Sequence, residues 1–219
     1  MSGEHTIHFD PTAHSYTSGG QVLPSVTQVL DILKPASFAS VPKEIMEAAG
    51  RRGTKVHKMI EDMGDSSLQQ ALEEPIEGLS WQEMARRKIS QRTDANLVGY
   101  VNAAKKFLAE SGFRTTSCEQ RLHHPIYKYA GTFDRSGTLG KRGSAIIDWK
   151  TGVVTSTARL QLAAYANLLK DPLMYRRIVV KLCCDGKYKV HEYPSRETNQ
   201  DFRVFLAALA CYRWRLQYN

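Results

Sequence analysis

The sequence predicts an α+β fold in which a central mixed β-sheet is flanked by helices. Two observations support this fold class. From residue 97 onward the predicted elements follow the order helix, three strands, helix, two strands and helix. The strand-like runs are short, apolar and bounded by glycine or other turn residues, and the helical segments carry apolar residues at helical spacing. A chain of 219 residues suits one domain, which we expect to span 1–219.

The N-terminal part, 1–112, is predicted to hold a β-hairpin followed by helices. Residues 4–17 alternate in polarity and turn at Asp10-Pro11, which favours a hairpin. Gly112 is expected to end the last helix of this part, which begins after Thr93 or Asp94. The other expected elements are helices at 25–33 and 81–92, a loop at 64–80, and helices at 42–49 and 54–63 that are separate or form one helix broken near Gly50 and Gly53.

The C-terminal part, 113–219, is predicted to form the sheet and two further helices. Asp185-Gly186 is a strong signal for a hairpin turn between the last two strands. The expected strands lie near 115–124, 127–136, 144–150, 176–184 and 187–193, and the helices near 157–170, with Thr155 or Ser156 near its N-cap, and 197–216. The apolar residues that give the last helix a buried face are Phe202, Phe205, Leu206, Leu209 and Leu216.

Asp148-Trp149-Lys150 ends a strand and carries two charged side chains on one face. Residues 145–147 before it form an apolar run typical of a buried strand, and side chains alternate along a strand, so Trp149 points away from its two neighbours. The glycine-rich stretch 137–143 predicts a turn that sets Asp134 opposite Asp148. Directly opposed residues lie roughly 4.5–5.5 Å apart at Cβ. Two ionised carboxylates that close repel each other, and a divalent cation such as Mg²⁺ resolves the conflict.

The acid-x-Lys pattern alone has little specificity. A second copy, Asp185-Gly186-Lys187, is interpreted as the hairpin turn named above. The first copy differs in its setting, with an apolar strand before it, an acid at hairpin register and a glycine after it. The alternative is a surface Asp–Lys ion pair at a strand end.

Four sequence blocks, taken in order, resemble the RecB-type branch of the PD-(D/E)XK nucleases. They are Gly53-Thr54-Lys55-Val56-His57, Gly131-Thr132-Phe133-Asp134, Asp148-Trp149-Lys150-Thr151-Gly152 and Gln161-Leu162-Ala163-Ala164-Tyr165. The opening Leu23-Pro24-Ser25-Val26-Thr27 also resembles the start of mitochondrial genome-maintenance exonucleases and of related phage-encoded exonucleases. The resemblance implies a restriction-endonuclease-like αβββαβ core and a metal-dependent nuclease activity.

This resemblance also implies a metal centre. Asp134 and Asp148 are its carboxylate ligands, His57 is a ligand carried on a helix, and the main-chain carbonyl of Trp149 adds an oxygen. Without the resemblance, a single helical histidine is more typical of a core or surface position. A histidine nitrogen beside carboxylates suits Mn²⁺ and also admits Mg²⁺. Lys150 is implied to position and help deprotonate the attacking water, or to stabilise the charge that develops on phosphorus.

Three further residues have implied roles beside this centre. Gln161 and Tyr165 are four positions apart on a predicted helix and share one face, which in the family lies beside the active site and the DNA backbone. The alternative is that Tyr165 packs on the sheet and Gln161 is solvated. Glu119 lies at the start of a predicted strand, where the family often has an acid that aids a metal-bound water or a second metal. A peripheral acid is the alternative.

Four residues of the N-terminal part are candidates for DNA contacts. Arg51 and Arg52 precede the His57 block and are expected to meet phosphate, although arginine pairs on helices are usually solvated. Ser25 and Thr27 are candidates for contact with a DNA terminus. For Ser25, a role as the N-cap of the following helix explains the residue equally well.

The cysteines do not follow the pattern of the relatives that carry an iron–sulfur cluster. The chain has four cysteines, but the clustered trio near the C-terminus is missing. Cys183 and Cys184 are adjacent on a predicted strand and should point to opposite faces, which separates them as ligands. We therefore expect no iron–sulfur cluster. The sequence also has no C-x-x-C spacing, so we expect no zinc site.

The charge balance favours a polyanionic partner. The 30 basic and 22 acidic residues give a formal net charge of +8, which suits salt-sensitive binding to nucleic acid. No apolar stretch approaches the roughly 20 residues of a membrane span, so no membrane association is expected. Residues 1–5 show no sign of a signal peptide. We expect a cytoplasmic protein, in the host bacterial cytoplasm if a phage encodes it.

The leading hypothesis is a metal-dependent DNA exonuclease that acts on single strands or open ends in DNA recombination or processing. A nuclease of this size is expected to lack its own helicase, so it needs open ends or a partner such as a recombination or single-strand-binding protein. One alternative is a structure- or sequence-selective endonuclease. The other is a catalytically inert DNA-binding module, against which the intact set of two acids and a lysine argues.

Overall fold

The computed structural model describes residues 6–10, 13, 15–34, 40–62 and 97–218. Several predicted features lie outside these residues: the loop at 64–80, the helix at 81–92, and Thr93 and Asp94, which were expected to precede the next helix. None of the helices in the described ranges combines the length and the apolar character needed to cross a membrane.

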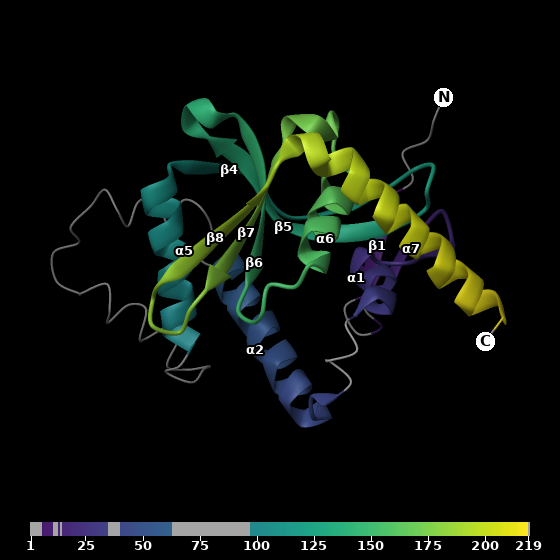
Figure 1. The fold of residues 1–219 in the computed structure, drawn as a ribbon, viewed down its shortest axis with the longest axis horizontal. Helices are drawn as coiled ribbons and strands as arrows, with labels where there is room; N and C mark the ends of the chain where they lie inside the picture. Colours follow the sequence, from purple (N-terminus) through teal and green to yellow (C-terminus); the bar gives the residue numbers. More distant parts are fainter. Residues whose placement is uncertain (1–5, 11–12, 14, 35–39, 63–96, 219) are drawn as a thin grey trace, which may run out of the picture.

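A five-stranded mixed sheet forms the centre of the fold (Figure 1). Only β6 and β7 are parallel, and the other neighbouring strands are antiparallel. The α+β fold class and the predicted order of helix, three strands, helix and two strands are confirmed. The strands in spatial order are β4 (Phe113–His123), β5 (Ala130–Leu139), β6 (Ser144–Lys150), β7 (Arg176–Leu182) and β8 (Tyr188–Tyr193).

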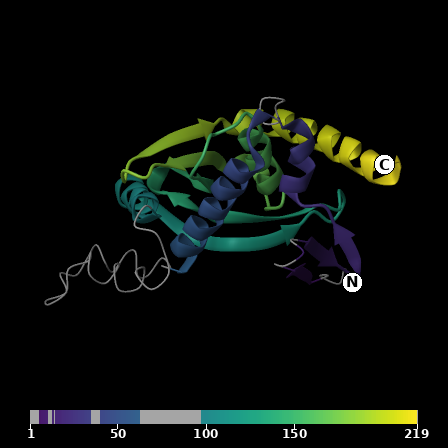
Figure 2. The ribbon, with the colours of Figure 1, turned by 90° about the horizontal axis from the view of Figure 1, so that it is seen from below.

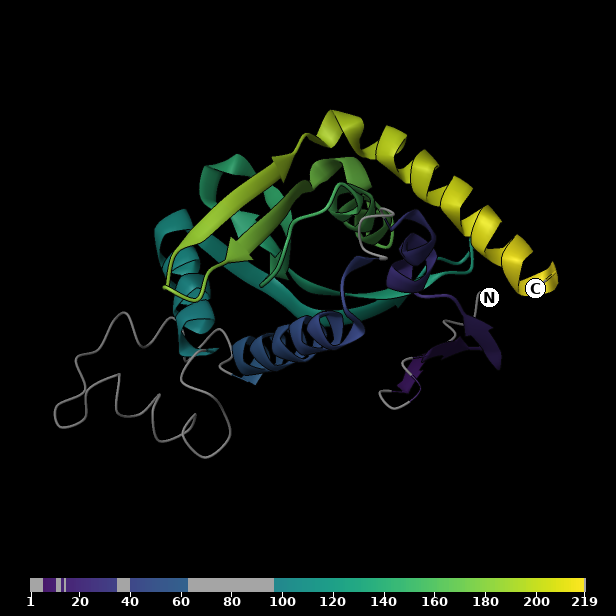
Figure 3. The same cartoon turned by 60° about the horizontal axis from the view of Figure 1, so that its bottom comes forward.

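Helices cover both faces of this sheet because its strands are apolar on both sides. Ile146 belongs to the core on one face and Ile147 to the core on the other, as alternation along β6 requires. The first core is closed by α1 (Val26–Leu30), α6 (Thr157–Ala166) and α7 (Thr198–Tyr218). The second is closed by α2 (Lys43–Asp62) and α5 (Val98–Ser111). Figure 3 shows α2 and α7 on opposite sides of the strands.

A smaller antiparallel sheet lies at the N-terminus, beside the end at which β4 and β5 join (Figure 2). The predicted hairpin is present, and a third strand follows it. The sheet consists of β1 (Ile7–Asp10), β2 (Ser15–Ser18) and β3 (Gln21–Leu23). Four short 3₁₀ helices complete the described elements: η1 (Asp31–Leu33), η4 (Gly140–Arg142), η5 (Pro172–Met174) and η6 (Ser195–Glu197).

Local signals fixed several of the element ends. The Ser25 side chain accepts a hydrogen bond from the main-chain N–H of Gln28, and the Gln28 side-chain oxygen accepts one from the main-chain N–H of Ser25, which forms a capping box at α1. Gly112 ends α5 in the left-handed conformation with φ of 66°. The predicted hairpin turn at Asp185-Gly186 is present, with Gly186 at φ of 80°.

The break expected near Gly50 and Gly53 does not occur, because α2 is one helix from Lys43 to Asp62. Each glycine weakens a helix by about 1 kcal/mol relative to alanine. Burial of Val56 and Ile60 against the sheet offsets that cost, since full burial of such a side chain contributes about 1.5–3 kcal/mol.

Other predicted boundaries needed correction as well. The helix predicted to reach residue 170 ends at Ala166, and the strand predicted to end near 136 continues to Leu139, which shortens the turn at 137–143. Cys183 and Cys184 follow the end of β7 rather than lying on it, so the argument from opposite strand faces does not apply to them. Leu216 is 69% exposed, because the last turns of α7 extend beyond the sheet (Figure 1).

Candidate metal centre and active site

The candidate site lies where β5 and β6 stop pairing. The register from Thr138↔Ser144 to Arg135↔Ile147 is the predicted one, and Asp134 and Asp148 are the next residues along each strand. Both are buried. The Oδ2 of Asp134 accepts a hydrogen bond of 2.6 Å from the main-chain N–H of Trp149, so a carboxylate takes the place of a main-chain partner. The sequence therefore places two acids at the point where the sheet opens.

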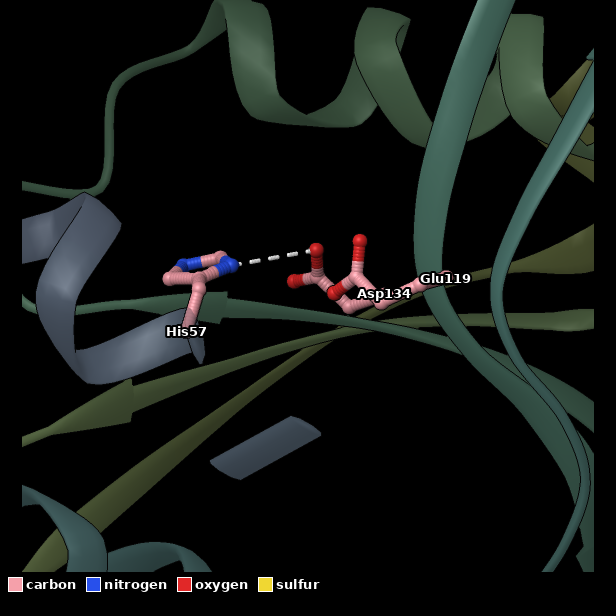
Figure 4. Close-up of side chains that lie close together, drawn as sticks. All are labelled: His57, Glu119 and Asp134. Atoms are coloured by element: carbon pink, nitrogen blue, oxygen red, sulfur yellow. Dashed lines mark ion pairs between the residues drawn. The ribbon is translucent and has the colours of Figure 1, made fainter. Parts of the chain in front are cut away.

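His57 reaches this opening from α2. Its neighbours Val56 and Ile60 are buried against the sheet, which fixes the helix and directs the imidazole toward β5 and β6. The Nδ1 of His57 lies 3.2 Å from Oδ1 of Asp134, and its Nε2 lies 3.0 Å from the carbonyl oxygen of Trp149. Figure 4 shows the imidazole facing the carboxylate of Asp134. Both ring nitrogens thus face oxygen atoms that accept hydrogen bonds.

Glu119 joins the cluster from β4. The β4–β5 pairing runs from Cys118↔Arg135 to Gln120↔Phe133, which sets Glu119 opposite Asp134. Glu119 has a φ of 48°, which is costly for a residue other than glycine and common at functional sites. Ligand atoms of His57, Glu119 and Asp134 all lie within 4.8 Å of one another (Figure 4). Glu119 lies within β4 rather than at the start of the strand.

Asp148 and Lys150 form the second half of the site. Lys150 Nζ lies 2.8 Å from Oδ2 of Asp148 and donates a hydrogen bond of 3.0 Å to Oε1 of Gln161 on α6. The Gln161 amide in turn donates to the hydroxyl of Tyr165, one helical turn further, at 3.1 Å. Gln161 is therefore part of a hydrogen-bonded chain rather than simply solvated, and Tyr165 both packs in the core and ends that chain.

Burial and charge shift the pKa values of these groups. Burial lowers the pKa of His57, but the charge and hydrogen bond of Asp134 outweigh it and raise that pKa to about 9. Burial, followed by the charge of Asp134, raises the pKa of Glu119 to about 7. Burial also raises the pKa of Asp148, whereas His57 and the Trp149 N–H keep the pKa of Asp134 low against its own burial. In the metal-free site, the histidine proton balances the charge of Asp134.

The donor set fits a divalent cation. Ligand atoms of His57, Glu119 and Asp134 lie together. The carbonyl oxygen of Trp149 lies at the other ring nitrogen of His57, and Asp148, whose Oδ2 pairs with Lys150, lies outside this group. The carboxylates of Glu119 and Asp134 repel each other when both are ionised, and a cation relieves that repulsion. The mixture of one nitrogen with several oxygens suits Mn²⁺ and also admits Mg²⁺.

The N-terminal candidates have other partners. Arg51 is exposed and forms a 3.4 Å ion pair with Glu47, and the guanidinium of Arg52 lies over the Tyr100 ring of α5, 5.8 Å from its centroid. Ser25 is buried and caps α1, and its hydroxyl lies 3.1 Å from that of Thr27. No contact described for these ranges of the chain joins the four residues to the cluster.

The sequence did not predict that the N-terminal sheet contacts β5 next to the candidate site. The hydroxyl of Tyr16 on β2 lies 2.8 Å from that of Thr132 on β5, and a Cβ atom at Gly131 would lie 2.6 Å from the ring of Tyr165. Gly131 is therefore required by the close approach of Tyr165. The sequence block that begins with Gly131-Thr132 indicated the need for a glycine at this position. No sequence pattern indicated the contact of Tyr16 with Thr132.

The order of helices and strands is consistent with a restriction-endonuclease-like αβββαβ core, and a possible metal site lies where its sheet opens. The family model described as the PD-(D/E)XK nuclease superfamily matches residues 28–200. The chain belongs to that superfamily. Among solved structures, it is similar to "Crystal Structure of LHK-Exo in complex with dAMP", with 12% identity, 90% of each chain covered and a TM-score of 0.33. Among curated proteins, no match to the chain was found.

Proposed function

We propose that this nuclease is a divalent-metal-dependent DNA exonuclease of the RecB-type branch, which hydrolyses phosphodiester bonds at single-stranded or open ends. The observation that carries this proposal is the convergence of His57, Glu119 and Asp134 within 4.8 Å, beside the Asp148–Lys150 pair. The net charge of +8 supports a polyanionic substrate. A role in DNA recombination or processing, with a recombination or single-strand-binding partner in the cytoplasm, is part of the same proposal.

In this proposal, His57, Glu119, Asp134, Asp148 and the carbonyl of Trp149 hold Mn²⁺ or Mg²⁺. A bound divalent cation lowers the pKa of a coordinated water and polarises a phosphoryl oxygen. Before the cation binds, the two hydrogen bonds of the His57 ring hold the imidazole in its place between the acid and the carbonyl.

Lys150 supplies the positive charge on the substrate side. Burial lowers its pKa, but the charge of Asp148 outweighs burial and raises it, so the ammonium stays protonated. Asp148 and Gln161 fix the position of Nζ, and Tyr165 fixes the amide of Gln161. An ammonium held in this way orients the attacking water and stabilises the negative charge that develops on phosphorus, without further reorganisation.

The test is an assay on end-labelled single-stranded, double-stranded and covalently closed circular DNA with Mn²⁺ or Mg²⁺. We expect release of nucleotides from linear DNA, loss of activity with chelator, and intact circles. Lys150→Ala and Asp148→Asn should each lower kcat by at least about 10²-fold. Cleaved circles would favour an endonuclease. Activity that persists in both variants or with chelator would refute the mechanism.

The chain supplies its own matched control for this experiment. Asp185 and Lys187 repeat the acid-x-Lys spacing in the exposed β7–β8 turn and form a 3.0 Å ion pair. Asp185→Asn and Lys187→Ala should retain wild-type activity. Calorimetric titration with Mn²⁺ separates the remaining alternative, because a module without a working site should bind no Mn²⁺.

A further inference from the structure

Arg121 lies beside the candidate metal centre, and none of the roles described above is assigned to it. It lies on β4, two residues beyond Glu119, and pairs with Thr132 of β5. It is exposed, and its guanidinium lies over the ring of Phe9 on β1, 5.2 Å from the ring centroid. The N-terminal sheet thus holds an arginine on the Glu119 side of the site.

Tyr16 connects this arginine to the centre. Its hydroxyl bonds to Thr132, the strand partner of Arg121, and its ring lies 4.7 Å from that of Phe9. Burial raises the pKa of Tyr16, the Thr132 bond and Arg121 lower it, and Glu119 raises it. Tyr16 is thus bonded to the strand partner of Arg121, and Arg121 follows Glu119 by two residues on β4.

Among the residues that the structure describes, none forms a hydrogen bond with the guanidinium of Arg121. A cation over an aromatic ring uses the ring face and leaves the edge N–H groups free to donate. Within the described ranges, no carboxylate lies at ion-pair distance from Arg121. By contrast, Lys58 on α2 pairs with Glu61 and Asp62. A guanidinium with free donors suits phosphate, which it can bind through two parallel hydrogen bonds.

We propose that Arg121 binds a backbone phosphate of the DNA strand, next to the phosphate that is hydrolysed, and that Phe9 holds the guanidinium in place. This inference rests on the proposed nuclease function and assigns the N-terminal sheet to the DNA-binding surface. Arg121 is then a substrate-positioning residue. Its loss weakens capture of the strand and leaves the chemical step intact.

The experiment compares Arg121→Gln with Arg114→Gln on labelled DNA with Mn²⁺. Arg114 is an exposed arginine on the same strand, paired with Thr138, and lies about 23 Å along the strand from Arg121. Both variants lose one positive charge. For Arg121→Gln we expect KM to rise about tenfold with kcat within about twofold, and the slope of log(kcat/KM) against log salt to become about one unit shallower. Arg114→Gln should match the wild type.

Two further variants test the geometry. Arg121→Lys keeps the charge but not the paired donors, so its KM should lie between those of the wild type and Arg121→Gln. Phe9→Leu changes no charge, and it should raise KM about two- to threefold by releasing the guanidinium. Thermal unfolding confirms that each variant is folded.

The outcomes separate the two proposals. If the wild type cleaves DNA while Arg121→Gln and Arg114→Gln have the same KM and the same salt slope, the Arg121 proposal is overturned and the proposed function stands. A fall in kcat without a rise in KM would also overturn it, because positioning a remote phosphate affects binding first. A wild type that neither binds nor cleaves DNA would remove the proposed function, and this inference with it.

Discussion

Binding of Mn²⁺ should release protons, in an amount that depends on pH. His57, with a pKa of about 9, is fully protonated at pH 6.5, and Glu119, with a pKa of about 7, is about three-quarters protonated. Ligands must be deprotonated to bind a cation, so binding at pH 6.5 should release about 1.8 protons from these two groups. At pH 8 the corresponding figure is about 1.0, because Glu119 is then ionised. The raised pKa of Asp148 adds to the release on the acidic side.

The assay is isothermal titration calorimetry of the metal-free protein with Mn²⁺ in several buffers of different ionisation enthalpy. At each pH, the slope of the observed enthalpy against the buffer enthalpy gives the number of protons released. Glu119→Gln should lower the release at pH 6.5 by about 0.8 protons and leave the value at pH 8 nearly unchanged. Glu47→Gln, an exposed acid on α2, should match the wild type at both pH values.

A release below about 0.3 protons at both pH values would refute this reasoning, because it would mean that neither ring nitrogen of His57 loses a proton to the cation. A release that is the same at pH 6.5 and pH 8 would remove Glu119 from the set of titrating ligands. Only the first result would require a cation site elsewhere in the protein.

Three further predictions concern stability. The folded-state pKa of His57 exceeds its ordinary value of 6.5, so the stability that its proton contributes is complete below pH 6.5 and is lost as the pH rises through about 9. The melting temperature of the metal-free protein should therefore fall over that range. Saturating Mn²⁺ should counteract the fall. Gly131→Ala should destabilise the protein by about 1–3 kcal/mol in urea unfolding, because its Cβ would lie 2.6 Å from Tyr165. Asp201→Ala should cost about 3–5 kcal/mol, because it leaves the fully buried Arg177 without its 2.8 Å partner.

Matched variants control these measurements. A Cβ atom at Gly53 would lie 3.7 Å from Oγ1 of Thr151, an ordinary contact, so Gly53→Ala should stabilise α2 by up to about 1 kcal/mol. Asp185→Ala removes an exposed ion pair and should cost less than about 1 kcal/mol. Equal unfolding free energies for Gly131→Ala and Gly53→Ala, or for Asp201→Ala and Asp185→Ala, would contradict the packing described here. A melting temperature that rises from pH 6.5 to pH 9 without metal would contradict the charge balance at His57.

The sequence by itself determined the features that depend on neighbouring residues. The alternation in β6 and the position of the turn before it set the pairing of β5 with β6, and hence the place of Asp134 opposite Asp148. Capping chemistry fixed the start of α1 at Ser25 and the end of α5 at Gly112. These features follow from strand periodicity and from backbone preferences that operate within a few residues. The four ordered motifs likewise led to the nuclease superfamily to which the chain belongs.

Only the tertiary structure decided how distant elements meet. His57 lies 92 positions before Trp149, and its contact with that carbonyl depends on the packing of α2 against the sheet. The position of Glu119 opposite Asp134 depends on a shift in the β4–β5 register between Thr115 and Ser117, which no local sequence pattern predicts. Packing of α2 against the sheet keeps this helix continuous through two glycines. The last turns of α7 extend beyond the sheet and have no such packing, so Leu216 is exposed. Local sequence sets what each element is, whereas burial of apolar surface between elements sets which side chains come together.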